Sequence, residues 1–148
     1  MELFDIIKDA KISRVLLGST VSGTAAAVTS VVEMDNYNNV CFIAGGLDTS
    51  GAGHLFKLQK CASTTGGTPV DLSGATASIV DGFATAVINV QKPRDRYIRG
   101  TYLKAAVASQ YRDVYAVQYN GRRGGYNLNT TSAADQGIEF VSVVSPTS

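Results

Sequence analysis

The strongest regular pattern in the sequence lies between residues 84 and 107, where apolar and polar side chains alternate on both sides of a charged segment. The alternation covers 86–91, stops at Pro93 and resumes over 97–104. A period of two puts successive side chains on opposite faces of a β-strand. Proline lacks an N–H and suits the second position of a turn. The pattern predicts a β-hairpin with its turn at 92–95.

Further segments show the same alternation, or a short apolar run bounded by turn residues. A second hairpin is predicted from 26–34 and 40–44, joined across the Asp- and Asn-rich residues 35–39. Segments 45–53 and 61–69 are rich in glycine and polar residues, and both are predicted loops. The remaining predicted strands are 12–17, 55–60, 71–80, 113–120 and 138–144.

Alternation also indicates which side chains face the protein interior. In each strand, the apolar set that recurs at every second position is the candidate core face. The predicted core residues are Phe56, Leu58, Ile88, Val90, Ile98 and Val117.

Composition favours one small β-domain. The chain has 148 residues, of which 45% are hydrophobic and 17% charged, with 15 glycines and no tryptophan. This length accommodates a single hydrophobic core. We predict an all-β, single-domain fold over residues 1–148, either a β-sandwich or a jelly-roll-like arrangement. Residues 1–11 are expected to form a short helix or an arm, and residues 121–148 a C-terminal loop, strand and tail.

The two ends and the two cysteines bear on where the protein is made. The acidic first residues, 1–8, do not resemble a secretory signal, and no apolar run approaches the ~20 residues needed to cross a membrane. We therefore expect synthesis in a cytoplasm, with no membrane partner. Cys41 and Cys61 are expected to be free thiols rather than a disulfide, because such compartments are reducing.

Motifs for catalysis or ligand binding fail on inspection. The glycine-rich segment 46–51 has the spacing of a phosphate-binding loop, but Ala52 and Gly53 replace the lysine and hydroxyl residue that contact phosphate and magnesium. His54 is the single histidine, so neither a conventional catalytic triad nor a His-Cys metal site can be assembled. We expect no enzymatic activity, no cofactor, no metal and no small-molecule substrate.

Charge is distributed unevenly along the sequence. Between residues 92 and 123 the net charge is +6, which leaves −5 elsewhere, and six of the seven tyrosines lie between residues 97 and 126. Arginine and tyrosine are concentrated at specific protein interfaces. A solvated charged face is the alternative, and Arg96 and Arg99 could instead pair with carboxylates within the fold or between subunits. The predicted interface residues are Lys92, Arg94, Arg96, Tyr97, Arg99, Arg122 and Arg123.

Three segments together resemble one protein family. The run INVQKPRDRYIR at 88–99 is similar to the Pro-Arg, Arg-Tyr-x-Arg signature of the small decoration, or cement, proteins of tailed-bacteriophage heads. The segments 31–43 and 55–59 are similar to further strands of that family. The chain departs from the family pattern at 122–125, where Arg-Arg-Gly-Gly stands in place of a basic-to-proline ending.

The resemblance implies a structural protein of the virion. Such a protein would be made in the host cytoplasm, bind the major capsid protein on the outer surface of the capsid, and form a homo-oligomer, specifically a homotrimer. A ligand that prefers the assembled shell stabilises it. A phage tail or fibre component is one alternative. The other is a single-stranded nucleic-acid-binding module that stacks bases on tyrosines, which the small net charge of +1 disfavours.

Overall fold

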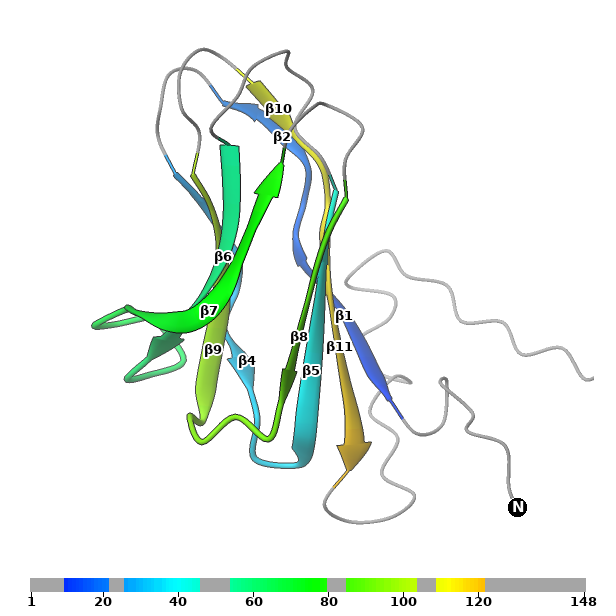
Figure 1. Ribbon diagram of the computed structural model, residues 1–148, viewed down its shortest axis with the longest axis vertical. Coiled ribbons are helices and arrows are strands. Elements are labelled where there is room, and N and C mark those ends of the chain that lie inside the picture. The colour runs from blue at the N-terminus through cyan, green and yellow to red at the C-terminus, as the bar shows by residue number, and fades with distance from the viewer. Residues whose placement is uncertain (1–9, 22–25, 46–53, 80–84, 104–108, 122–148) are drawn as a thin grey trace, which may run out of the picture.

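The computed structural model describes residues 10–21, 26–45, 54–79, 85–103 and 109–121. They form an all-β sandwich of two facing antiparallel sheets, which confirms the predicted fold class (Figure 1). Several predicted features lie outside the described residues. They are residues 1–9 of the N-terminal arm, residues 46–53 of the predicted loop, the predicted strand 138–144, and both Arg122 and Arg123.

The first sheet has four strands in the order β1-β11-β5-β8. All three neighbouring pairs are antiparallel, so β8 and β11 run in the same direction. The strands are β1 (Lys11–Leu16), β5 (Tyr37–Ala44), β8 (Ala86–Gln91) and β11 (Val114–Gly121).

The second sheet has five strands, in the order β3-β9-β6-β7 with β4 also paired to β9. Its pairs are antiparallel as well. The strands are β3 (Ala27–Val28), β4 (Val32–Glu33), β6 (His54–Cys61), β7 (Val70–Ile79) and β9 (Tyr97–Leu103).

A short third pair lies at one end of the sandwich. Here β2 (Ser19–Val21) pairs with β10 (Ser109–Tyr111), as Figure 1 shows at the top. Each short strand can be grouped with its neighbour along the chain, namely β2 with β1, β4 with β3 and β10 with β11. The chain then has eight strand units, which we number 1 to 8 in sequence order. Their order is 1-8-3-6 in the first sheet and 2-7-4-5 in the second. This is the order of a jelly roll, in which the chain crosses repeatedly between the two sheets.

The predicted hairpin at 84–107 is wrong in its pairing, although both of its strands exist. β8 pairs with β5 in the first sheet, whereas β9 pairs with β6 in the second. Residues 92–96 therefore link the two sheets. Lys92 adopts a left-handed conformation (φ 48°), and its N–H donates to the Asn38 carbonyl at 2.8 Å. Alternation identifies which face a side chain occupies, but it does not identify the neighbouring strand.

The second predicted hairpin is wrong for the same reason. β3 and β4 pair with β9, while β5 belongs to the opposite sheet. The bend between them is closed by hydrogen bonds from the Met34 N–H to the Arg96 carbonyl (2.7 Å) and from the Tyr37 N–H to the Met34 carbonyl (3.3 Å). By contrast, β6 and β7 are a true antiparallel hairpin joined by residues 62–69.

The core lies between the two sheets and contains a cluster of aromatic rings tilted against one another. The ring of Phe56 lies 5.0 Å from that of Tyr102 and 6.5 Å from that of Phe42, measured between centroids. Gly100 lies directly beneath Phe56, and a Cβ added there would come within 2.9 Å of the Phe56 Cε2 atom. A glycine at 100 is therefore needed for the aromatic ring to pack against the backbone of β9.

The predicted core is confirmed in part. Phe56, Leu58 and Ile98 are fully buried. Ile88 and Val90 point inward but are only half-buried, because β8 is at the edge of its sheet. Val117 does not belong to the core. In β11 the buried residues are Val114, Ala116 and Gln118, so Val117 is on the outer face of the sheet.

Candidate interaction surfaces

The predicted interface residues that the structure describes lie at or near the end of the sandwich where residues 92–96 link the sheets. Arg96 is engaged within the fold, since its Nη2 atom is 2.7 Å from both the Glu33 Oε1 and the Asp35 Oδ2 atoms. The hydrogen bond to Glu33, with further help from Asp35, raises the pKa of Arg96. Its guanidinium carbon also lies 5.1 Å from the centre of the Tyr97 ring. Arg96 therefore pairs with carboxylates within the fold, which was one of the alternatives that the sequence left open.

Arg99 has a structural role of a different kind. Its Nε donates to the Gln59 side-chain oxygen at 3.1 Å, and its Nη1 to the Gly66 carbonyl at 3.4 Å. These contacts join β9 to β6 and to the loop of the β6–β7 hairpin. Gly66 has a φ of +78°, and a Cβ there would come within 2.9 Å of the Arg99 Nη1 atom. The half-buried Arg99 thus contacts uncharged groups rather than the carboxylates considered from sequence.

Lys92 and Arg94 remain available for a partner. Both are exposed, and neither side chain is paired with a carboxylate among the described residues. Asp95 between them is 3.6 Å from Lys60. The fold brings acidic residues from outside the basic segment to this end, so the charge separation along the sequence is only partly retained in space. We call Lys92 and Arg94 the link-end cations.

A second surface, on the outer side of the first sheet, was not predicted from sequence. Its side chains lie in rows across the paired strands, and Tyr115 is opposite Ile43, which is opposite Val87. Val87 is 59% exposed and Ile43 36%. Val117 and Cys41 form the next row. We call these five residues the sheet face.

The sheet face is largely uncharged. Arg14 is opposite Tyr115 on the neighbouring strand, and it forms an ion pair with Asp113, with 3.8 Å between the Arg14 Nη1 and Asp113 Oδ2 atoms. The sequence carried a signal of this surface in the run Val40–Ala44, which is apolar at every position and not only at alternate ones. A run that is apolar on both faces is typical of a strand with both faces buried, yet Ile43 on the outer face of β5 is exposed.

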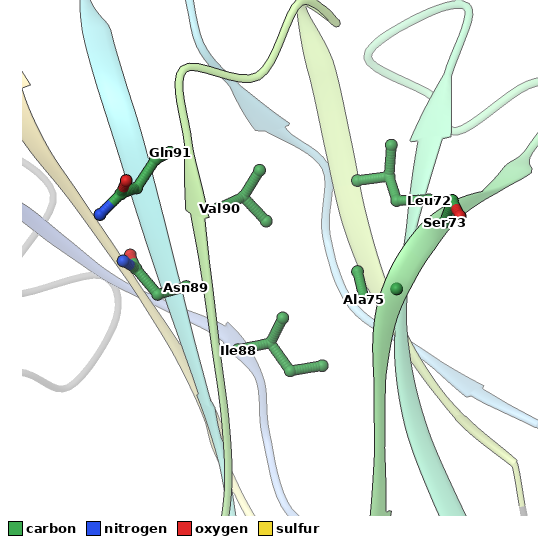
Figure 2. Close-up of a pocket in the computed structure, with 8 residues that line it drawn as sticks. Leu72, Ser73, Ala75, Ile88, Asn89, Val90 and Gln91 are labelled. Atoms are coloured by element: carbon green, nitrogen blue, oxygen red, sulfur yellow. The ribbon is translucent and has the colours of Figure 1, made fainter.

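A groove separates the two edge strands β7 and β8 (Figure 2). Its volume is about 300 Å³, and Leu72, Ile88 and Val90 point into it from opposite sides. The groove exists because β7 bulges: the pairing with β6 jumps from Lys57↔Thr76 to Gln59↔Asp71, which leaves extra residues on β7. The lining residues are Leu72, Ser73, Gly74, Ala75, Ile88, Asn89, Val90 and Gln91.

Gly74 was the available sequence signal for this groove. It has a φ of +78° in the middle of a strand, and nothing lies within 4 Å of the position that a Cβ would take. Glycine inside a strand pattern marks a bulge or a close approach of another backbone. Since nothing lies near the position of a Cβ on Gly74, the bulge in β7 explains its left-handed conformation, and a close contact does not.

Other chemical groups give little indication of a reactive site. His54 is buried in β6, and no cluster of three or more metal-ligating side chains occurs within the described ranges. Cys41 and Cys61 form no disulfide, as predicted, but they are half-buried, and burial raises the pKa of both thiols. In the described part of the chain, no helix has the length and apolar character needed to span a membrane.

Comparison with known proteins gives distant structural similarity. No family model and no curated protein matches the chain. A protein of the disulfide-linked pili of Bacillus endospore appendages has a TM-score of 0.45 and 18% identity, over 76% of this chain and 89% of that one. FlhE has a TM-score of 0.39 and 14% identity over 76% and 98%. PirA has a TM-score of 0.32 and 11% identity over 80% and 97%. Similarities at this level carry no argument about function.

Proposed function

We propose that this chain is a structural virion protein that binds the outer surface of a tailed-phage capsid as a homo-oligomer, most simply a trimer, and stabilises the shell. The observation that supports adhesion is the sheet face, an uncharged surface on which Val87 and Ile43 are exposed and the other three residues are half-buried. The partner, the major capsid protein, comes from the sequence resemblance. A protein that binds only the assembled shell shifts the equilibrium toward assembly.

The sheet face has the chemistry of a contact between copies of the chain. Tyrosine with branched aliphatic side chains is typical of interface cores, where charged residues are depleted. Because Ile43, Val87 and Tyr115 project from neighbouring β-strands, their positions are set before binding, and little ordering is required. We assign self-association to this surface.

The link-end cations have the chemistry of the capsid contact. Lys92 and Arg94 project from the link between sheets, beside an ion-paired cluster that already uses Arg96. Charged residues that lack an internal partner can pair with carboxylates of another protein, which gives register and orientation. Arg122 and Arg123 remain proposed members of the same contact.

Aspartate in place of Val87 should dissociate the oligomer, because a carboxylate would be buried without a partner in the interface. Light scattering should then report a molar mass near the 15.5 kDa of one chain. The control is Val70→Asp, since Val70 is similarly exposed (48%) but lies on the opposite sheet. A wild-type protein that is monomeric at all concentrations and also on the particle would refute the oligomer.

Reversing both link-end cations, with Lys92→Glu and Arg94→Glu, should weaken binding to decoration-free capsids at least about tenfold in Kd. Disrupting a desolvated charge pair costs about 2 to 5 kcal/mol, and about 1.4 kcal/mol corresponds to tenfold. Arg96 is left intact because its reversal would repel Glu33 and Asp35 within the fold.

The control for this variant is Arg112→Glu, which reverses an exposed cation beside Gly45, at the end of the sandwich opposite the link. Co-sedimentation with capsids at moderate salt measures both variants. If the Lys92/Arg94 variant is folded and binds like the wild type, the link end is not the capsid contact. If wild-type protein binds no capsid at all, the proposed function is wrong.

The two alternatives remain distinguishable by experiment. A tail or fibre component would be seen on the tail in electron micrographs of the particle. A single-strand-binding module requires accessible aromatic rings. Tyr102 and Tyr111 are buried in the core and cannot stack on bases, and the other tyrosines of the region that the structure describes, Tyr97, Tyr115 and Tyr119, are only half-exposed. Oligonucleotide affinity that falls steeply with salt would nevertheless favour that alternative.

A further inference from the structure

The free edge of β8 differs from the other edges of the two main sheets. Sheet edges are normally protected from pairing with other chains by charged side chains, bulges or short strands. At the opposite edge of the first sheet, β1 carries Lys11 and Arg14 and has an irregular register before Leu16. In the second sheet, β3 and β4 have two residues each, and β7 is bulged at Gly74. Among these described edges, β8 is the one that is both regular and uncharged.

The register of β8 identifies which of its backbone groups face the open edge. Lys92 donates its N–H to the Asn38 carbonyl at 2.8 Å, and the same antiparallel register runs through β8 and β5. In an antiparallel pair, alternate residues direct their N–H and C=O groups toward the partner strand, and the others direct them away. The even-numbered residues of β8 therefore bond to β5, and the odd-numbered residues face the open edge. The odd-numbered residues are Val87, Asn89 and Gln91.

This edge is complementary to a second copy of itself. Two β8 strands that run antiparallel about a two-fold axis at Asn89 place each Asn89 opposite the other, and Val87 opposite Gln91. All the odd-numbered residues then form hydrogen-bonded pairs. On the groove side, Ile88 of one copy lies opposite Val90 of the other. No like charges meet, because β8 contains no charged residue.

We propose that β8 joins two copies of this chain by antiparallel pairing of their edge strands about a two-fold axis at Asn89. The first sheets of the two copies then form one continuous sheet, and the same surface of both copies is used. A single strand pair is small beside a standard interface, so the pair dissociates on dilution. It uses backbone groups rather than the side chains of the sheet face, and it does not require a capsid. The inference therefore goes beyond the proposed function.

The groove adds apolar burial to these hydrogen bonds. Leu72, Ile88 and Val90 point into it from opposite sides, and all three are half-buried against the core (Figure 2). A two-fold axis at Asn89 makes the grooves of the two copies face each other, so each copy covers the apolar lining of the other. Removing this apolar surface from water stabilises the pair.

The position of the axis is restricted by the strand itself. A shift of the register by one residue would set outward-facing backbone groups opposite groups that already bond to β5. A shift by two residues would leave one odd-numbered residue of each β8 strand without a partner in the other. The axis at Asn89 pairs all three of them and also matches the apolar residues on the groove side.

Amide hydrogen exchange at micromolar and millimolar protein tests the pairing in the full chain. Concentrating the wild-type protein should slow exchange of the Val87, Asn89 and Gln91 amides at least about tenfold, because the pair supplies their hydrogen bonds. The Ile88 and Val90 amides bond to β5 in the single chain, so they are internal controls and should change far less. Exchange of the odd-numbered amides that does not depend on concentration, whether fast or slow, would overturn the proposal.

Charge substitutions at the axis test the register. Asn89→Asp and Asn89→Lys each place like charges opposite one another, so each variant alone should weaken the pair at least about tenfold in Kd. An equimolar mixture should recover the wild-type affinity, because the mixed pair sets a carboxylate opposite an ammonium group. The readout is the protein concentration at which the Val87 and Gln91 amides become protected. Asn89 is exposed, and aspartate keeps an oxygen to accept the hydrogen bond from the Tyr119 hydroxyl (2.7 Å).

The matched controls are Asn36→Asp and Asn36→Lys, at an exposed turn residue outside β8. Neither should change the concentration dependence. Ile43→Asp alters the sheet face but not the edge of β8, and it should leave the protection in place. Loss of protection in Ile43→Asp but not in the Asn89 variants would assign the contact to the sheet face and overturn the proposal. A mixture of the Asn89 variants that does not recover the pair would overturn it as well.

Discussion

Replacing Phe56 with alanine should lower the free energy of unfolding by about 3 to 5 kcal/mol. Phe56 is fully buried at the centre of the second sheet and joins the aromatic group formed with Phe42 and Tyr102. Its ring also fills the space above Gly100. Truncation would leave a cavity between the sheets that the stiff strands cannot close.

Chemical denaturation of the wild type and the variant measures this loss. A total stability of about 5 to 15 kcal/mol is usual for a domain, so the variant could retain only a small part of it. Val70→Ala, at an exposed position of the neighbouring β7, is the control and should change stability by at most about 0.5 kcal/mol. A Phe56 variant no less stable than this control would show that the two sheets do not pack as described.

Ile98→Ala should cost about 2 to 5 kcal/mol, and Ile88→Ala clearly less. Both substitutions remove the same atoms. Ile98 is fully buried in β9 between β4 and β6, whereas Ile88 is half-buried at the open edge of the sandwich. The cost of truncation increases with the number of neighbouring atoms that lose contacts.

Thermal or urea unfolding of the two isoleucine variants gives the comparison. Because they share one chemical change, the difference between them reports burial alone. Equal losses would mean that Ile88 is as deeply buried as Ile98, which would contradict its half-buried position at the edge of the sandwich. A larger loss at Ile88 than at Ile98 would contradict the assigned faces of β8 and β9.

Local alternation identified most strands and several of their faces. β6 and β11 were predicted within a residue or two, and Phe56 and Leu58 were placed correctly in the core. The reason is that a strand with one buried face needs apolar residues at every second position, and this requirement is visible within the strand itself. Val117 was misassigned because both faces of β11 carry apolar residues, so the period did not discriminate between them.

The pairing of strands was not visible in the sequence. Both predicted hairpins have short polar connections, and each connection in fact crosses from one sheet to the other. Facing sheets are about 10 Å apart and neighbouring strands about 4.8 Å. A connection of five residues such as 92–96 can span either distance, so its length does not distinguish a hairpin from a crossing.

The candidate surfaces, too, were visible in part from the sequence and in part only from the fold. The residue types at 92–99 indicated an interaction region, but only the fold showed that Arg96 is held by Glu33 and Asp35, residues about 60 positions earlier in the chain. It also showed that Arg99 supports the loop at Gly66, and that the two link-end cations have no carboxylate partner among the described residues.

The sequence by itself determined an all-β domain, the positions of most described strands and the inward residues of the well-patterned ones, because these follow from periodicity and turn chemistry within short segments. Only the tertiary structure decided the jelly-roll order, the sheet face, the groove beside Gly74 and the ion pairs of Arg96. Each of these depends on contacts between segments far apart in the chain. Such contacts are selected by the packing of the whole sandwich and leave no local pattern.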